Sequence, residues 1–281
     1  MSDHADRDHC AHAPEHAAAP LPSRLPTCAT CPVKEQALCR GVPIGDLERL
    51  FGYGQRVFAR KAGSTLFEQG EAFEHVLIVQ SGWALVYKLF EDGRRQIIRF
   101  ALPGDLLGFE GDDTVGMLYT AEALTDIRVC AIRREPFCRA CQNSPLFSLN
   151  VARSLAHEML AAWNHMGALG QQTAQARIAS LLLDLHRRVE ARQGRHKVTV
   201  PIPLNQVLIA DATGLTSVHV CRTLKQMRLD GLLEFARGEL LVLDGDRLNA
   251  MAQLDPDVSP AMVAGTGAPH DRSHGRSRVL A

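Results

Sequence analysis

Short apolar segments, separated by glycines, dominate the chain between residues 45 and 136. Apolar or β-branched runs occupy residues 64–67, 75–79, 84–87 and 96–100. Asp92-Gly93 lies between the last two runs, and an Asp-Gly pair in that position is a strong hairpin signal. Short strands at this even spacing are typical of a small antiparallel barrel or roll. We therefore predict a β domain in this part of the chain.

A helical period replaces this pattern after residue 144. Ser144 suits an N-cap and Pro145 the first helical position, and the helix is expected to run to about Gly170. Apolar residues along it step by four, three, four and three, at Leu155, Met159, Ala162, Met166 and Leu169. This a/d pattern predicts a two-stranded coiled coil and hence a homodimer. The pattern is short, and packing of the helix on its own domain is the alternative.

The C-terminal part predicts a DNA-binding fold. Residues 174–192 form an amphipathic helix, and residues 198–203 an extended link. Helices over 205–212 and 217–228, with Thr216 as N-cap of the second, flank a turn at Gly214, as in a helix-turn-helix. The second helix buries Val220, Leu224 and Met227. It leaves Ser217, Val218, His219, Cys221 and Arg222 for the major groove, where Arg222 can bond a guanine. Residues 234–243 are typical of a two-stranded wing.

Length and charge narrow the picture further. A chain of 281 residues is expected to hold about two domains. Its formal net charge is zero, so any contact with DNA must come from a local basic patch. No apolar run is long enough for a membrane helix, and the N-terminus lacks a secretory pattern, so we expect a cytoplasmic protein. Residues 1–26 and 251–281 have the composition of disordered tails.

Cysteines carry the candidate chemistry. Cys28, Cys31 and Cys39 fall within a dozen residues, among prolines that favour a loop over a helix. A fourth, Cys130, lies in a strand over residues 126–132, on the face opposite Val129. If Val129 faces the core, Cys130 points outward, where the cysteine loop can dock. Four thiolates suit a tetrahedral zinc or an iron–sulfur cluster, and cytosolic cysteines more often serve metals or redox sensing than disulfides.

Other arrangements are open from the residues alone. Cys138 and Cys141 form a second C-x-x-C pair, which with Cys28 and Cys31 would make a structural zinc site. A disulfide switch among Cys28, Cys31 and Cys39 would need no metal. No His/Glu spacing suits a catalytic zinc, and no nucleophile lies beside a base, so we predict that the protein is not an enzyme. A plain small-molecule-binding module is the remaining alternative.

The order of these parts resembles the Crp/Fnr superfamily of bacterial transcription regulators. The resemblance runs from about residue 28 to residue 250, and segments 63–70, 102–109 and 214–225 carry it. It implies an α+β fold: a cysteine loop and cyclic-nucleotide-binding-like β-roll over 27–143, a dimerisation helix over 144–171, and a winged helix-turn-helix domain over 172–250. The three N-terminal cysteines and the Val-Cys-x-Ile segment at 129–132 resemble the Fnr branch. The C-x2-C-x7-C spacing resembles its FnrN- and AadR-like members.

The Fnr branch implies a 4Fe–4S cluster on Cys28, Cys31, Cys39 and Cys130. It also implies a homodimer without oxygen, binding to a palindromic promoter site in double-stranded DNA, contact with RNA polymerase, and loss of DNA binding when oxygen dismantles the cluster. Structural zinc, a thiol–disulfide pair and haem are the alternative sensors.

The sequence departs from the superfamily in two places. Met117 and Leu118 stand where the cyclic-nucleotide branch has an Arg-Ser pair, and Phe109 replaces its Glu, so cyclic AMP is not expected as the effector. Val218 and Cys221 replace the Glu and Ser with which Fnr helps to read its half-site, whereas Arg222 matches the family Arg. A valine cannot accept a hydrogen bond from cytosine, so the Fnr half-site is not carried over.

Overall fold

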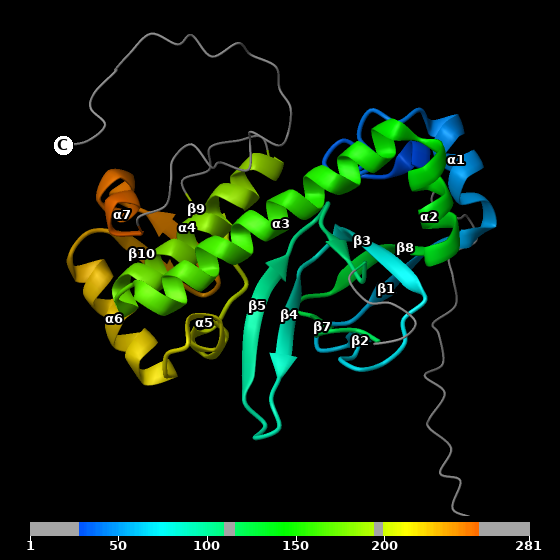
Figure 1. Ribbon diagram of the computed structural model, residues 1–281. Helices are drawn as coiled ribbons and strands as arrows, with labels where there is room; N and C mark the ends of the chain where they lie inside the picture. Colours follow the sequence, from blue (N-terminus) through cyan, green and yellow to red (C-terminus); the bar gives the residue numbers. More distant parts are fainter. Residues whose placement is uncertain (1–27, 110–115, 194–198, 253–281) are drawn as a thin grey trace, which may run out of the picture.

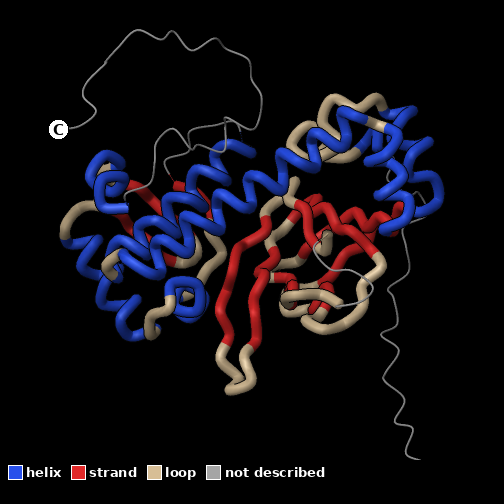
Figure 2. Tube along the Cα trace, viewed as in Figure 1, coloured by secondary structure: helices blue, strands red, loops and turns tan. Residues whose placement is uncertain are grey.

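The computed structural model describes residues 28–109, 116–193 and 199–252 (Figure 1). The tail predicted at 1–26 lies outside the described residues, as does the tail predicted at 251–281 except for residues 251 and 252, which are helical. Most strands gather into a roll with short helices beside it, further helices gather at the other end of the molecule, and one long helix runs across both (Figure 2). Each helix of the described chain is too short or too polar to cross a bilayer.

The roll consists of two four-stranded antiparallel sheets, with strand orders β1-β8-β3-β6 and β2-β7-β4-β5. The strands are β1 Gln55–Arg60, β2 Thr65–Phe67, β3 His75–Ser81, β4 Ala84–Leu89, β5 Arg95–Ala101, β6 Leu106–Leu107, β7 Thr120–Ala123 and β8 Ile127–Arg133. Apolar side chains such as Leu77, Val86 and Val129 fill the space between the sheets. The predicted roll is confirmed, although β1, β6 and β7 were not anticipated from the sequence.

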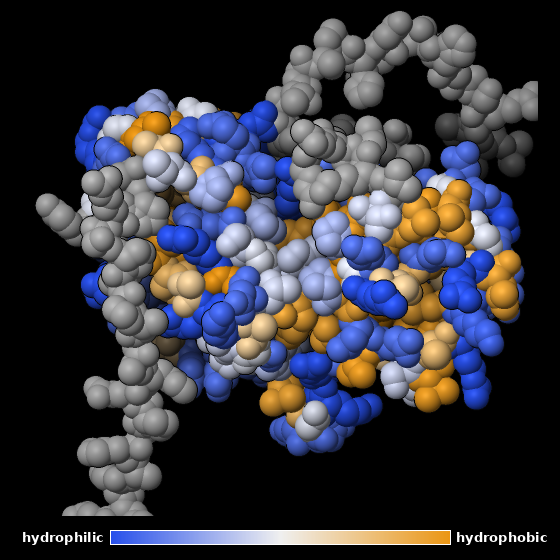
Figure 3. All heavy atoms as spheres, turned by 180° about the vertical axis from the view of Figure 1, so that it is seen from behind, coloured by the Kyte–Doolittle hydropathy of each residue, from blue (hydrophilic) through white to orange (hydrophobic). Residues whose placement is uncertain are grey.

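Two glycines show why the turns of the roll form where they do. Gly93 has φ 79°, and the β4–β5 hairpin around it confirms the Asp92-Gly93 prediction. Gly82 has φ 80°, and a Cβ there would lie 2.2 Å from the Asp126 carbonyl oxygen, so only glycine fits. The β4–β5 hairpin projects below the body of the molecule (Figure 3). Leu89 and Phe90 near its tip are about half exposed.

Short helices cover the outer face of the β1-β8-β3-β6 sheet. They are the 3₁₀ turns η1 Cys28–Thr30 and η2 Gly52–Gly54, and the helices α1 Ile44–Phe51 and α2 Arg134–Asn143. Phe147 packs edge-on against Phe51 and Phe137, with ring centroids 5.5 Å and 5.4 Å away. The interpretation of residues 45–136 as strands alone was wrong at α1, whose eight residues are too few for their helical period to stand out.

The long helix α3 spans Pro145–Gln171 and begins as predicted. The Ser144 side chain accepts a hydrogen bond from the Phe147 backbone N–H, and Pro145 occupies the first turn. Gln172 then turns the chain into α4, Ala174–Gln193, which buries Ile178, Leu182 and Leu185 against the C-terminal domain.

The C-terminal domain packs three helices and a small sheet behind α4. Its elements are α5 Gln206–Thr213, α6 Ser217–Leu229, α7 Gly245–Ala252, β9 Thr199–Pro201, β10 Leu233–Ala236 and β11 Glu239–Val242. The predicted helix-turn-helix and wing are confirmed. The extended link was a partial misreading, because residues 199–201 pair with β11 as a third strand.

Ion pairs hold the C-terminal domain against the roll. Arg188 of α4 lies 2.6 Å from Asp105, and Arg192 bonds the other oxygen of the same carboxylate. Arg95 of β5 lies 2.6 Å from Asp211 of α5. Burial alone would raise the pKa of Asp105, but the guanidinium groups of Arg192, Arg188 and Arg99 outweigh it and lower that pKa to about 2. Asp105 is therefore ionised at neutral pH and stabilises the contact between the two domains.

We expect Asp105→Asn to lower the free energy of unfolding by about 2 kcal/mol at pH 7, in line with the pKa shift. Because the folded-state pKa lies below the unfolded value, this contribution is complete above pH about 4 and disappears as the pH falls toward 2. Urea denaturation at several pH values measures it. Asp46→Asn is the control, since its exposed pair with Arg49 contributes little; equal losses in both variants at pH 7 would contradict the expectation.

Candidate functional site

The cysteine loop, residues 28–42, lies on the outer face of the roll. It forms turns rather than a continuous helix, as predicted, and Val33, Leu38 and Val42 anchor it by burying their side chains in the core beneath. Cys28 and Cys39 are buried, and Cys31 is partly exposed. The anchors therefore place all three thiols on the sheet side of the loop.

Cys130 reaches the same place from β8. Val129 and Ala131 face the inside of the roll, whereas Cys130 and Ile132 face the other way, as the strand alternation predicted. Cys130 lies opposite Val57 of β1 and Ile78 of β3 in the sheet. The Cys130 thiol does point away from the inside of the roll, as expected, but it does not reach the molecular surface. The cysteine loop and α1 cover that face and leave Cys130 only 4 % exposed.

One small cavity between the loop and the sheet joins these parts. Its lining comprises Cys28, Cys31, Lys34, Ala37, Cys39, Leu47, Phe51, Gln55, Ile78, Cys130 and Ile132. The structure therefore brings together all four cysteines singled out from the sequence. Across the described residues, no three His, Cys, Asp or Glu side chains are grouped to hold a single metal ion. Four thiols that line one cavity are a donor set that suits a sulfur-ligated metal centre.

Two glutamine side chains form hydrogen bonds with the thiols. The Gln55 amide donates to the Cys130 sulfur at 3.2 Å and accepts from the Cys28 thiol at 3.4 Å, which bridges loop and strand. The amide of Gln80, 5 % exposed, donates to the Cys31 sulfur at 3.7 Å. The sequence analysis missed both residues, because β1 was not recognised and an isolated polar residue in a strand carries no local signal.

Burial dominates the protonation of these thiols. Desolvation raises the pKa of Cys130 to about 12, although the hydrogen bond from Gln55 opposes the shift. Burial likewise raises the pKa of Cys28 and, more strongly, of Cys39, and the neighbouring thiols add to both shifts. Because neighbouring thiols add to the raised pKa values of Cys28, Cys39 and Cys130, a cation bound among them is what would favour the thiolate forms.

The second C-x-x-C pair lies elsewhere. Cys138 is exposed and Cys141 is half-buried on α2, and neither lines the cavity. The structure thus does not bring Cys138 and Cys141 together with Cys28 and Cys31, as a shared zinc site would require. All seven described cysteines are free thiols.

Two of the three positions that differ from the cyclic-nucleotide branch, Met117 and Phe109, hold apolar side chains that pack in the roll, whereas Leu118 is exposed. Met117 is buried, Leu118 is 51 % exposed, and the Phe109 ring packs 5.6 Å from that of Phe137. Arg134 lies close by, but its guanidinium donates to the carbonyl oxygens of Phe73 and Gly108. It is thus engaged in holding the roll together.

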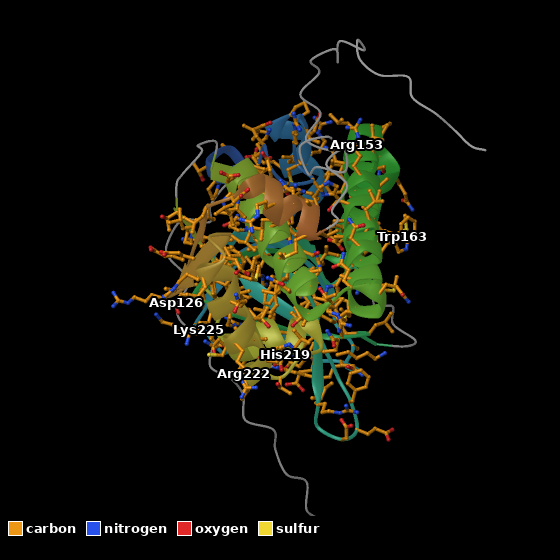
Figure 4. All side chains as sticks on the ribbon, turned by 90° about the vertical axis from the view of Figure 1, so that its left-hand side faces the viewer. Asp126, Arg153, Trp163, His219, Arg222 and Lys225 are labelled. Atoms are coloured by element: carbon orange, nitrogen blue, oxygen red, sulfur yellow. The ribbon has the colours of Figure 1, made fainter. Side chains whose placement is uncertain are left out.

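The helix-turn-helix presents one exposed face. Gly214 ends α5 in the left-handed conformation (φ 65°), and the Thr216 hydroxyl caps α6 by accepting from the His219 backbone N–H at 3.2 Å. The predicted core residues of α6 are buried, and the predicted DNA-facing residues are all exposed. His219 and Arg222 lie on the outer surface with Lys225, which the sequence analysis passed over although it follows Arg222 by one helical turn (Figure 4).

An exposed apolar stripe runs along α3. Its members step by three and four residues: Leu149, Ala152, Ala156, Met159, Trp163, Met166 and Gly170. We call this set the outer stripe. Met159, Trp163 and Met166 are 48 %, 52 % and 60 % exposed, and Trp163 lies on the side of α3 that faces away from the body (Figure 4).

The outer stripe overlaps the predicted dimer seam only in part. Met159 and Met166 belong to both, but Leu155 packs against the core beneath the cysteine loop. Ala162 and Leu169 line a cavity between α3, α4, α5 and β5. These three residues thus contact the chain's own domains, which is the alternative that the sequence left open for the helix.

Comparisons with known proteins agree with this architecture. Residues 58–144 match the family model of the cyclic nucleotide-binding domain, and residues 176–251 match that of the Crp-like helix-turn-helix domain. Among solved structures, FixK2 from Bradyrhizobium japonicum is similar with a TM-score of 0.64 and 29 % identity, over 72 % of this chain and 98 % of that one.

Curated relatives extend the similarity over most of the sequence. The nitrogen fixation regulation protein FixK of Bradyrhizobium diazoefficiens is 32 % identical, over 80 % of this chain and 93 % of its own. The transcriptional activator protein FnrL of Cereibacter sphaeroides is 32 % identical over 84 % and 96 %. The transcriptional activatory protein AadR of Rhodopseudomonas palustris is 33 % identical over 79 % and 91 %. With both domain matches and relatives of this coverage, the chain belongs to the Crp/Fnr family of transcription regulators.

Proposed function

We propose that this regulator is a homodimeric transcriptional activator that senses oxygen through a 4Fe–4S cluster held by Cys28, Cys31, Cys39 and Cys130. The observation that carries the proposal is the convergence of these four thiols, three from a loop and one from a strand, on one cavity. The resemblance to the Fnr branch and the names of the relatives FnrL and AadR support it.

The chain's own residues give the site its sensitivity. The cluster, when bound, supplies an oxygen-labile centre with thiolate ligands. Gln55 and Gln80 donate hydrogen bonds to two of the four sulfurs, those of Cys130 and Cys31, and Lys34 lines the cavity with a positive charge that favours thiolates. Ligation at Cys130 ties the cysteine loop to the rigid roll, whereas release of the thiols leaves the loop held by its apolar anchors and by a few side-chain hydrogen bonds.

The outer stripe is the surface that we assign to the dimer. Its steps of three and four residues suit a parallel two-stranded coiled coil, and its large members are exposed on the single chain. Ala152, Ala156 and Gly170 are small, so two helices can approach closely there. Pairing along α3 would set two α6 helices about 34 Å apart, the spacing of half-sites on one turn of DNA.

Each α6 helix would then contact one half of a palindromic promoter site. Arg222 suits bidentate contact with guanine, Val218 suits contact with a thymine methyl, and Lys225 and Arg237 suit phosphates. Arg237 is exposed at the tip of the wing between β10 and β11. Activation further implies contact with RNA polymerase.

Zinc, a thiol–disulfide pair and haem remain the competing sensors, and composition separates them. Iron and acid-labile sulfide support the cluster, zinc alone a structural metal, and a sharp Soret band haem. A metal-free protein whose cavity thiols oxidise reversibly would support the disulfide alternative.

Serine substitution tests the ligand set. Cys28→Ser, Cys31→Ser, Cys39→Ser and Cys130→Ser are each expected to lose most of the iron and sulfide found in anaerobically purified wild type, because each removes one thiolate. Metal analysis and visible absorption measure the loss. Cys138→Ser and Cys141→Ser are the controls and should keep the wild-type content; a full complement of iron in Cys130→Ser would contradict the assignment.

Charge substitution tests the dimer surface. Trp163→Glu is expected to make the free energy of dimerisation without oxygen less favourable by about 2–4 kcal/mol, because it places two carboxylates in an apolar interface. Analytical ultracentrifugation without oxygen measures it. Leu243→Glu, at a residue 49 % exposed outside α3, is the control. A wild-type dissociation constant for Trp163→Glu would place the interface elsewhere.

Substitution on α6 tests the DNA contact. Arg222→Ala is expected to weaken binding by about 1–3 kcal/mol to sites that anaerobic wild type selects from random DNA, and to relax the preference at one base pair. Fluorescence anisotropy at fixed salt measures both effects. The control is Arg139→Ala, which removes an exposed arginine on α2; unchanged binding by Arg222→Ala would remove this residue from the interface.

A further inference from the structure

Asn150 joins the long helix to the cysteine loop. It lies in the second turn of α3, and its side-chain amide donates to the Leu38 carbonyl oxygen at 3.0 Å and to the Arg40 carbonyl oxygen at 2.8 Å. These two carbonyls flank Cys39. The side-chain amide of Asn150 thus donates both of its N–H groups to the backbone carbonyls on either side of Cys39.

Apolar contacts around Asn150 also hold the cysteine loop against α3. Cys39 is buried together with Phe147 and Val151, which lie on either side of Asn150 in α3. Leu146, one turn earlier, is close enough that a Cβ on Gly41 would lie 3.6 Å from its Cδ2 atom. Apolar packing thus brings the loop to the helix. The Asn150 amide also fixes the orientation of the loop backbone, because both of its hydrogen bonds form only when the two carbonyl groups point toward it.

Asn143, at the end of α2, has no such role. The Asn143 side chain donates to the Arg139 carbonyl oxygen one turn earlier in its own helix. Asn150 instead reaches carbonyls more than a hundred residues away in sequence. A residue that only completed the hydrogen bonding of α3 would not bridge two segments in this way.

We propose that Asn150 is the positioning residue that couples the state of Cys39 to the outer stripe of α3. The inference rests on the proposed function and adds the route from sensor to dimer. Ligation of Cys39 fixes the carbonyls of Leu38 and Arg40, and so fixes Asn150. Leu149, the first residue of the outer stripe, is its neighbour in the same continuous helix. In the structure, where Cys39 is a free thiol, Asn150 bonds both carbonyls. Release of Cys39 therefore leaves these two hydrogen bonds as the directed contact between the loop and the first turns of α3, but no ligated cysteine between the carbonyls fixes them any longer.

Asn150→Asp tests this with the smallest change in shape, since a carboxylate cannot donate to either carbonyl. The matched control is Asn143→Asp. The first measurement is the ratio of dimer dissociation constants for air-treated and anaerobic, iron-loaded protein. We expect a wild-type ratio within about 5- to 150-fold, the usual range for coupled sites, and a ratio near one for Asn150→Asp with unchanged iron and sulfide content. A stability defect alone would not remove the difference between the two states.

The second measurement needs no cluster. Iodoacetamide labelling of reduced, metal-free protein, mapped by mass spectrometry, should modify Cys39 several-fold faster in Asn150→Asp than in wild type or Asn143→Asp, with Cys28 as the internal reference. If Asn150→Asp is poorly folded, Asn150→Ala, which adds no charge, takes its place in both measurements. Wild-type values in both would overturn the inference. Absence of iron from the wild type would overturn the proposed function instead, and the labelling result would then decide the inference alone.

Discussion

Backbone hydrogen bonds within the cysteine loop close short local turns, such as that from Ala37 N–H to the Val33 carbonyl oxygen at 2.9 Å. They do not pair the loop with the sheet, so its place on the roll depends on what holds its buried side chains. Val33, Leu38 and Val42 supply apolar contact, which is adaptable, while the thiols supply contacts that a common ligand would make directional. Burial makes isolated thiolates costly at this position, as the raised pKa of Cys130 shows. Ligation of the sulfurs would instead favour the thiolate forms. The proposed sensing depends on this difference between ligated and free thiols.

The architecture gives such a change a short path to the DNA-binding domain. The loop lies against the first turns of α3, α3 carries the outer stripe, and α4 follows α3 after a brief turn. The loop also contacts α4 directly, because the Gln36 side chain donates to the Arg192 carbonyl oxygen at 3.1 Å. Arg192 in turn bonds Asp105 of the roll. Sensor, helix and DNA-binding domain therefore meet around these polar contacts. They also share apolar packing, because Ile97 and Phe100 of the roll are buried in one cluster with Leu182 and Leu208 of the C-terminal part.

Local sequence signals predicted much of this fold. The Asp92-Gly93 hairpin, the Ser144-Pro145 helix start, the Thr216 cap and the Gly214 turn each follow from the chemistry of a few adjacent residues. The four-cysteine grouping could be anticipated from spacing and from the alternation of β8. The structure adds that loop and α1 enclose Cys130, which strand alternation alone cannot reveal.

What the sequence could not supply was tertiary in origin. In α3, apolar residues stand side by side at Leu155-Ala156, Ala162-Trp163 and Leu169-Gly170, so two registers fit the same period. Only the position of α3 on the roll and on α4 shows that the first member of each pair is turned inward. Gln55, Gln80 and Asn150 escaped notice for a similar reason, since each is an ordinary polar residue whose partners lie far away in the chain. The strand β9 likewise exists only because β11 is there to pair with it.

The most direct test of the central claim is the iron and acid-labile sulfide content of protein purified without oxygen, measured together with its oligomeric state and DNA binding before and after exposure to air. We predict about four iron and four sulfide ions per chain and a dimer that binds its selected site. Exposure to air should remove the iron and sulfide, dissociate the dimer and abolish DNA binding. Iron-free protein that dimerises and binds the same site equally well with and without oxygen would contradict the central claim.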